Sequence, residues 1–366
     1  MEPAAENPVA LKPVEVQHLS PSQLFWRRLR RQRIAAIGAI ILAILYVMAL
    51  LAGFVAPYHF ERMDRQRFFH SPTWLQFRGG KLVVPRYKQV EGSFKYAPSH
   101  SDYQPIRFFV RGDKYKWLGL VPSNLHLFGT ADPVNYPVYL LGTDQYGRDI
   151  FSRLLYGSQI SLSIGLIGIA LSFSFGMLIG GMAGYFGGWS DNAIMRLSEL
   201  LMSIPGLYLI MALRMAFPPK LSSVQMYLLI VVILSFVRWA ASARVIRGMA
   251  LSIRERQFVL AARSLGQSNL RVIVKHLLPN TFSYVIVAAT LSIPYYILGE
   301  VVLSFLNVGI QEPDASWGIM LNAAQNPGYL TDYPWLLAPG VAIFITVLAF
   351  NFLGDGLRDA VDTKNQ

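Results

Sequence analysis

The sequence contains no cysteine and few charged residues. Asp, Glu, Lys and Arg make up 15% of its 366 residues, against about a quarter in a typical soluble domain. Without cysteine there is no disulfide framework, thiolate zinc site or cysteine nucleophile. The sequence also lacks a GxxxxGK[ST] phosphate loop, an HExxH motif, a GxSxG motif and any metal-ligand spacing among its six histidines. We therefore expect no cofactor, no metal and no catalytic activity of its own.

Hydrophobic residues make up 53% of the chain and are concentrated in long runs. This pattern excludes a typical cytoplasmic enzyme, a disordered chain and a fibrous protein, and it favours a polytopic membrane protein. The net charge of +12 could indicate nucleic-acid binding. Basic residues here cluster beside the apolar runs, however, where cytoplasmic loops and anionic lipids favour them. We expect contact with a lipid bilayer and not with nucleic acid.

Six apolar runs are long enough for membrane helices, which need about 20 residues. The first, 34–56, is uncharged, follows an arginine-rich stretch and stops at Pro57. Its length and long polar leader favour an uncleaved span over a signal peptide. The other candidates are 160–185, 193–217, 224–243, 282–310 and 335–353. The run 193–217 is weaker because it contains charges. Six spans place both termini on one side.

Lys and Arg in short loops predict which side that is. The leader 1–33 and the connection between the fourth and fifth spans are both rich in arginine. Six spans with a cytoplasmic N-terminus place both segments inside, in agreement with the positive-inside rule. The basic residues of 57–156 do not count against this orientation, because long translocated segments do not follow the rule.

The segment 57–156 has no membrane span but contains short β-type runs. These runs are 81–84, 106–110 and 115–118, and prolines and the pair Gly79-Gly80 separate them. We predict a small, partly β unit outside the membrane. It either provides a docking surface and shapes an entrance, or simply packs on the helix ends.

Glycines in the second span predict close helix packing. Gly176, Gly180 and Gly184 repeat every four residues and form one flat helix face. Such a face serves either as a seam between helices that move or as ordinary static packing.

Three charged residues fall within or near the predicted spans. Glu300 is expected to face the bundle interior, either paired with a donor or lining a translocation path. Arg214 lies near the outer end of the third span and could snorkel towards water. Arg238 lies in the inner half of the fourth span. Burial in an interhelical hydrogen bond without a role in transport is an equal alternative for Glu300.

The cytoplasmic connection at about 254–280 has a distinctive local pattern. A short helix is predicted to end at Gly266, in the position after a helix C-cap that glycine favours. A second helix leads to Leu278-Pro279, where proline suits a first helical turn. Ala261 and Ala262 give the first helix a low surface that another protein could approach. An amphipathic loop on the membrane surface is the alternative.

This connection resembles the EAA loop of the integral membrane subunits of ABC importers. That pattern reads Glu-Ala-Ala, three residues, Gly, nine residues, then Ile-x-Leu-Pro. The matching residues are Ala261, Ala262, Gly266, Leu278 and Pro279. Leu260 stands in place of the Glu and His276 in place of the Ile, and the helix–Gly–helix–Leu-Pro frame is retained.

Other segments narrow the resemblance to the C-type permease subunits of the dipeptide, oligopeptide and nickel group. They are 141–157, 184–189, 303–306 and 354–359, so the resemblance covers roughly 140–362. It implies an all-α type I importer fold with six membrane helices and an unusually long extracytoplasmic insertion between the first two. The implied divisions are 1–33 leader, 34–56 first helix, 57–156 insertion, 157–355 permease core and 356–366 cytoplasmic tail.

The resemblance also implies partners and a mechanism. Such a subunit pairs with a second, homologous permease, two cytoplasmic ATPases and an extracytoplasmic solute-binding protein in a prokaryotic cell membrane. The EAA helix docks on an ATPase and transmits its movement to the path. Peptides are the expected substrate and nickel the alternative. The residues alone leave an ion-gradient-driven secondary transporter as a rival.

Overall fold

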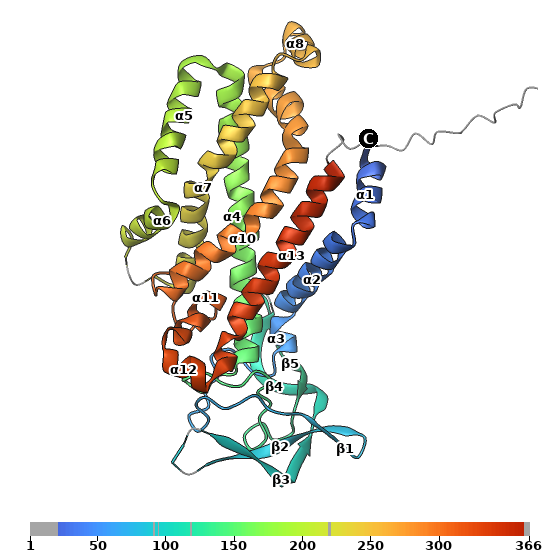
Figure 1. The fold of residues 1–366 in the computed structure, drawn as a ribbon, viewed down its shortest axis with the longest axis vertical. Helices are drawn as coiled ribbons and strands as arrows, with labels where there is room; N and C mark the ends of the chain where they lie inside the picture. The colour runs from blue at the N-terminus through green and yellow to red at the C-terminus, as the bar shows by residue number, and fades with distance from the viewer. Residues whose placement is uncertain (1–20, 91, 94, 118, 219–220, 362–366) are drawn as a thin grey trace, which may run out of the picture.

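The computed structural model describes residues 21–361 except 91, 94, 118, 219 and 220. The start of the leader and the end of the tail lie outside the described residues. The described chain is a bundle of long helices with a group of strands at one end (Figure 1). Its α-helices are α1 (Pro21–Arg31), α2 (Arg33–Leu50), α3 (Ala52–Val55), α4 (Ile150–Phe186), α5 (Gly188–Ser203), α6 (Gly206–Met215), α7 (Ser223–Ile253), α8 (Gln257–Ser264), α9 (Asn269–Val272), α10 (Phe282–Phe305), α11 (Trp317–Met320), α12 (Pro327–Asp332) and α13 (Ala338–Val361).

Within the part of the chain that the structure describes, five helical stretches are long and apolar enough to cross a membrane. They are Arg33–Leu50, Ile150–Phe186, Ser223–Ile253, Asn269–Phe305 and Pro334–Val361. The predicted third span is instead two helices, α5 and α6, which meet at an angle of 93°. Pro205 stands at this bend, where it has no N–H to continue the hydrogen bonding of α5. The described residues therefore contain five candidate spans, or six if the bent pair crosses the membrane as one.

The predicted fifth span was wrong at its end, because α10 stops at Phe305 and not at 310. Asn307 adopts a φ of +60°, the left-handed conformation that asparagine tolerates after a helix C-cap. The N–H of Asn307 bonds to the carbonyl of Ser304, and that of Val308 to the carbonyl of Leu303. These bonds close the helix. Glu300 consequently lies only about 7 Å from the end of its helix, at 1.5 Å per residue.

Helix α4 lies at the centre of the bundle and contacts α2, α7, α10 and α13 (Figure 1). The predicted flat glycine face packs on α7. A Cβ added at Gly180 would lie 2.3 Å from the carbonyl oxygen of Ala243, and one at Gly176 would lie 2.0 Å from the Ser242 hydroxyl. The two backbones approach too closely for any larger residue. Buried aliphatic and aromatic side chains from α4, α7 and α10 form the main core, and Leu201, Trp239, Ala240 and Ala243 form a smaller cluster near the glycine contact.

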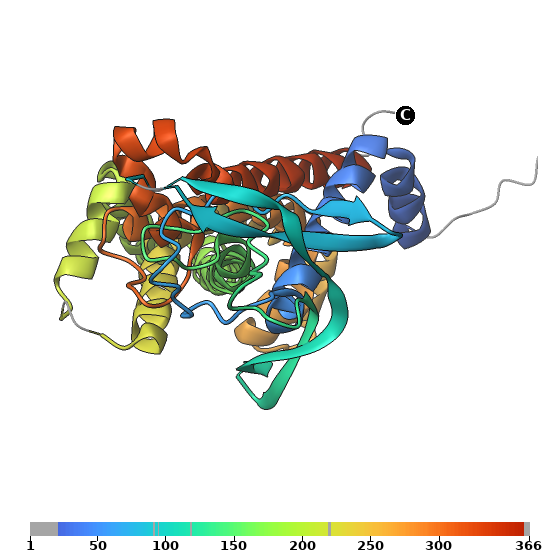
Figure 2. The same cartoon turned by 90° about the horizontal axis from the view of Figure 1, so that it is seen from below.

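The strands form two separate antiparallel sheets (Figure 2). One contains β1 (Gln76–Arg78), β2 (Lys81–Gln89) and β3 (Tyr96–Pro105), and the other is the hairpin of β4 (Arg107–Trp117) and β5 (Val121–Gly129). Prolines were predicted to separate strands, yet Pro85 pairs with Tyr103 within the first sheet. Strand β1 pairs only with residues 81–83 of β2. Pro85 therefore has no neighbouring strand on the β1 side that would require its missing N–H.

The ends of the molecule differ in character. Helix α1, the C-terminal end of α13 and helix α8 lie at one end of the bundle, and the strands lie at the other (Figure 1). Gln32 donates to the Asp359 carboxylate at 2.9 Å, which joins the start of α2 to the end of α13.

The glycine face yields a stability prediction. Gly180→Ala should lower the unfolding free energy by about 1–3 kcal/mol, because the added methyl overlaps the α7 backbone. The matched control is Gly248→Ala on α7, where an added Cβ meets nothing within 4 Å. That variant should unfold at or slightly above the wild-type temperature, because alanine favours a helix. Equal melting temperatures for the two variants in detergent would contradict the close contact.

Candidate functional site

The connection between α7 and α10 begins with the short helix α8, which ends where glycine was predicted to end it. Gly266 has a φ of +74°. Its N–H bonds to the carbonyl of Arg263, and the N–H of Gln267 bonds to the carbonyl of Ala262. This paired closure is the Schellman arrangement, in which glycine carries the left-handed residue without strain. Space around Gly266 is open, because an added Cβ would meet nothing within 4 Å.

Helix α8 has one buried face and one exposed face. Val259 and Ala262 are buried in a cluster with residues of α4, α7 and the start of α10. Ala261 faces outward, and the side chain of Leu265 is 82% exposed. The structure therefore separates the two predicted alanines: Ala262 attaches the helix to the bundle, and Ala261 belongs to its free surface.

The rest of the connection runs almost continuously into α10. After α9 come a π-helical turn (Ile273–Leu277) and a 3-10 turn (Leu278–Thr281), with Pro279 in the first turn of the latter. Leu278 is buried beneath Gly181 of α4. The Tyr185 hydroxyl at the end of α4 donates to Asn269 at 2.9 Å. The connection is thereby fixed to α4 as well as to its own two helices.

His276, which stands at the expected isoleucine position, makes a polar contact. Its Nε2 lies 3.0 Å from Oε1 of Gln267, across the turn that follows Gly266. Leu260, at the expected glutamate position, is exposed and adds an apolar group to the outer surface of α8.

Glu300 is fully buried and bonded within the chain. Its carboxylate accepts hydrogen bonds from the hydroxyls of Ser161 on α4 at 2.9 Å and Ser304 on α10 at 2.7 Å. Each serine oxygen in turn accepts a backbone N–H, from Trp317 and Ile310 respectively. Each serine hydroxyl is therefore a donor to the carboxylate and an acceptor for the backbone. This arrangement joins α4, α10, α11 and the loop between α10 and α11. Glu300 is thus paired with hydrogen-bond donors, which is one of the alternatives predicted from the sequence.

The two predicted arginines occupy different environments. Arg214 does not snorkel to water: it is buried, and its Nε donates to the carbonyl of Val308 at 2.9 Å. It therefore attaches α6 to the loop after α10. Arg238 is half-buried, with its guanidinium 4.8 Å from the centre of the Tyr295 ring, a distance typical of a cation–π contact.

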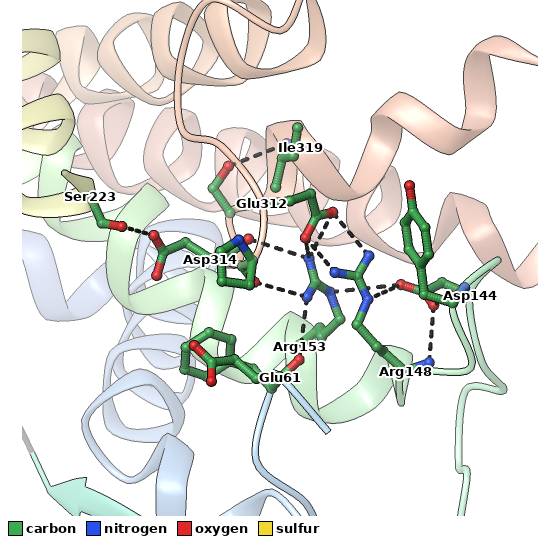
Figure 3. A network of polar contacts seen from close by, with 12 residues as sticks. Glu61, Asp144, Arg148, Arg153, Ser223, Glu312, Asp314 and Ile319 are labelled. Atoms are coloured by element: carbon green, nitrogen blue, oxygen red, sulfur yellow. Dashed lines mark hydrogen bonds and ion pairs between the residues drawn. The ribbon is translucent and has the colours of Figure 1, made fainter. Parts of the chain in front are cut away.

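A second charged cluster joins the segment before α4 to the loop after α10 (Figure 3). The side chains of Arg148 and Arg153 are only 4% and 2% exposed. Arg148 Nε donates to Asp144 at 2.7 Å and its Nη2 to Glu312 at 2.9 Å. Arg153 Nη2 donates to the same Glu312 carboxylate at 3.1 Å. Two buried cations are thus balanced by two carboxylates.

Arg153 also binds the backbone of two other segments, one between α3 and α4 and one in the loop after α10. Its Nη1 donates to the carbonyls of Phe60 and Pro313, each at 3.3 Å. A cavity of about 120 Å³ lies beside the cluster, bordered by Tyr146, Asn307 and Glu312 among others. Sequence reasoning did not select this cluster, because Arg148 and Glu312 are 164 positions apart and neither lies in a recognisable pairing motif.

Long apolar helices packed around a buried carboxylate define an integral membrane protein that crosses the bilayer several times. Within the described residues, no group of three or more His, Asp and Glu side chains could hold a metal ion.

Comparison with known proteins places the chain more narrowly. Residues 176–366 match the family of binding-protein-dependent transport system inner membrane components, and residues 20–72 match the N-terminal transmembrane domain of oligopeptide transport permease C. The chain belongs to this permease family, which confirms the predicted resemblance to C-type peptide permeases.

Individual relatives cover almost the whole chain. The dipeptide transport system permease protein DppC of Bacillus subtilis is 35% identical over 94% of this chain and 87% of its own length. The glutathione transport system permease protein GsiD of Escherichia coli O6:K15:H31 is 34% identical over 99% of this chain and 96% of its own. The match to the solved inward-facing MetNI methionine ABC transporter covers 57% of this chain and 96% of that transporter chain, with a TM-score of 0.39 and 18% identity.

The Glu300 contacts predict a structural role that can be separated from transport. In Glu300→Gln, the new NH₂ faces a serine hydroxyl that already donates towards it, so one buried hydrogen bond is lost at a cost of about 1–3 kcal/mol. The melting temperature in detergent should fall, and solute uptake should fall only in proportion to the folded protein. Uptake that is lost at a wild-type melting temperature would instead show a direct role in the path.

The arginine cluster predicts a stability effect that depends on burial. Glu312→Gln removes one of two charges that balance Arg148 and Arg153, and should cost about 1–3 kcal/mol. The control is Glu199→Gln, which breaks a pair with the exposed Arg196 and should cost under about 1 kcal/mol. Thermal unfolding of both variants tests the difference. A Glu312→Gln variant as stable as the control would show that the cluster adds nothing.

Proposed function

We propose that this chain is the membrane permease subunit of an ATP-driven ABC importer, and that it forms half of a translocation path for peptides. The family match and the names of its relatives, which include dipeptide and glutathione permeases, support this function. They favour peptides over nickel and an ATP-driven importer over an ion-gradient-driven transporter. The proposed partners are a second homologous permease, two cytoplasmic ATPases and an extracytoplasmic solute-binding protein.

The exposed face of α8 is the proposed contact with an ATPase. Ala261 and Leu265 provide a small and an apolar side chain on this face, which suits insertion into a groove of another protein. The buried Ala262 and the Leu278-Pro279 turn hold the helix against the bundle. ATP binding on the partner would then shift the equilibrium between two packings of the membrane helices through this helix.

The ends of the bundle support the proposed orientation. Helix α8 lies at the same end as α1 and the C-terminal end of α13 (Figure 1), as a cytoplasmic location of both termini and of the EAA loop requires. The strands lie at the opposite end, where a solute-binding protein would deliver its cargo.

Gly266→Glu tests the proposed coupling. The variant places a charge on the free surface beside α8 and should reduce ATPase co-purification, or substrate-stimulated ATP hydrolysis, by about tenfold, a change equivalent to about 1.4 kcal/mol. The matched control is Gly80→Glu in the β1–β2 turn. Gly80 also has a positive φ, of +75°, and open space around it, so both variants carry a similar backbone strain.

The control should leave ATPase association and hydrolysis at wild-type levels. The coupling assignment is wrong if Gly266→Glu does the same, or if both variants lose activity equally.

A further inference from the structure

The β4–β5 hairpin turns back towards the membrane helices. It projects from the other strands beside α2 and α3 (Figure 2). The ring of Tyr115 packs on Gly53 of α3, where an added Cβ would lie 2.3 Å from the ring. Near the hairpin tip, the indole Nε1 of Trp117 donates to the carbonyl of Leu50, the last residue of α2, at 2.8 Å. These contacts fix the tip against the end of the first span.

The tip overlaps the apolar part of that span. Leu50 lies six residues before the end of the uncharged run 34–56, or roughly 9 Å inside it at 1.5 Å per residue. Gly119 borders the same pocket as Tyr46 of α2 and Leu166 of α4. The hairpin therefore extends past the end of the apolar run instead of staying in the water beyond it.

The side chains of the tip are suited to a lipid interface. Leu120 is 81% exposed, and Trp117 and Val121 are also exposed. Lys114 and Lys116 precede Trp117 on β4 and are exposed as well. Tryptophan beside aliphatic groups, with lysines one step further out, is the distribution found at a bilayer surface, where the indole lies at the headgroups and ammonium groups reach water or lipid phosphates.

The tip also adjoins an apolar surface of the bundle. Leu50 on α2 and Leu166 on α4 border the same pocket as Gly119, and both are exposed, so this surface is available to acyl chains. At the end of α2 the last carbonyl groups have no partner within the helix, and lipid offers no donor. The Trp117 indole supplies one for Leu50.

We propose that the tip of the β4–β5 hairpin is a membrane anchor, in which Trp117, Leu120 and Val121 enter the headgroup and upper acyl region of the leaflet beside α2. The contact of the tip with the exposed Leu50 and Leu166 supports lipid as the occupant. A helix of a partner protein is the competing occupant, and the experiment below separates the two. The proposal requires only that the chain spans the membrane, and it is independent of the transported substrate.

The absence of native cysteine allows a direct test. Leu120→Cys and Val121→Cys are each labelled with the fluorophore NBD in the full-length chain, purified with the subunits that accompany it and reconstituted in nanodiscs. Phe77→Cys on β1 is the matched control, because Phe77 is also apolar and 74% exposed but belongs to the other sheet. Leu120 is so exposed that its replacement removes little packing, and a wild-type melting temperature verifies each variant.

The two tip positions should be quenched at least twofold more than position 77 by lipids carrying a doxyl group on acyl carbon 5, and several-fold less by aqueous iodide. Quenching by iodide equal to that at position 77 would place the tip in water. Protection from both quenchers would show that protein covers it. Either of these results overturns the proposal.

Discussion

Burying a carboxylate within a membrane protein is costly unless donors surround it, and the centre of this structure is organised by that requirement. Glu300 accepts the hydroxyls of Ser161 and Ser304, and both serines are themselves held by backbone N–H groups. These bonds force α4, α10 and the loop that leads to α11 together. Glycine allows α11 to approach α10 this closely, because an added Cβ at Gly318 would lie only 2.7 Å from the Val301 carbonyl oxygen.

The arginine cluster extends the same connection beyond the apolar core. Arg148 and Arg153 lie on either side of the start of α4, and both bind Glu312 in the loop after α10. Arg153 adds the carbonyl of Phe60, so the chain that follows the first span is included. The central helix α4 is therefore joined once to α10, through the Glu300 carboxylate inside the bundle, and once to the loop after α10, through paired charges at the end of α4.

Hydrophobic patterning predicted most of the long helices, because a span in lipid must satisfy its own backbone and leaves a continuous apolar run in the sequence. Gly266 was also predictable, since its role depends on local backbone conformation alone. The bend at Pro205 and the end of α10 at Asn307 were missed, because a run of apolar residues does not show where a helix turns. The bonding partners of Glu300 and Arg148 were not predictable either. Ser161 is 139 positions from Glu300, and only the folded bundle brings such residues together.

The length of α4 has a mechanical consequence. Its 37 residues measure about 55 Å at 1.5 Å per residue, against a hydrocarbon thickness of about 30 Å. Some of the helix must stand outside the lipid, and the end beside the strands carries the arginine cluster and, through Phe60, the chain leading to them. The strands are thus attached to the end of a rigid helix and not to a flexible linker. A tilt of α4 by about 10° would move its outer end by several ångströms. A rearrangement of the membrane helices would therefore displace the surface at the end of the molecule opposite α8.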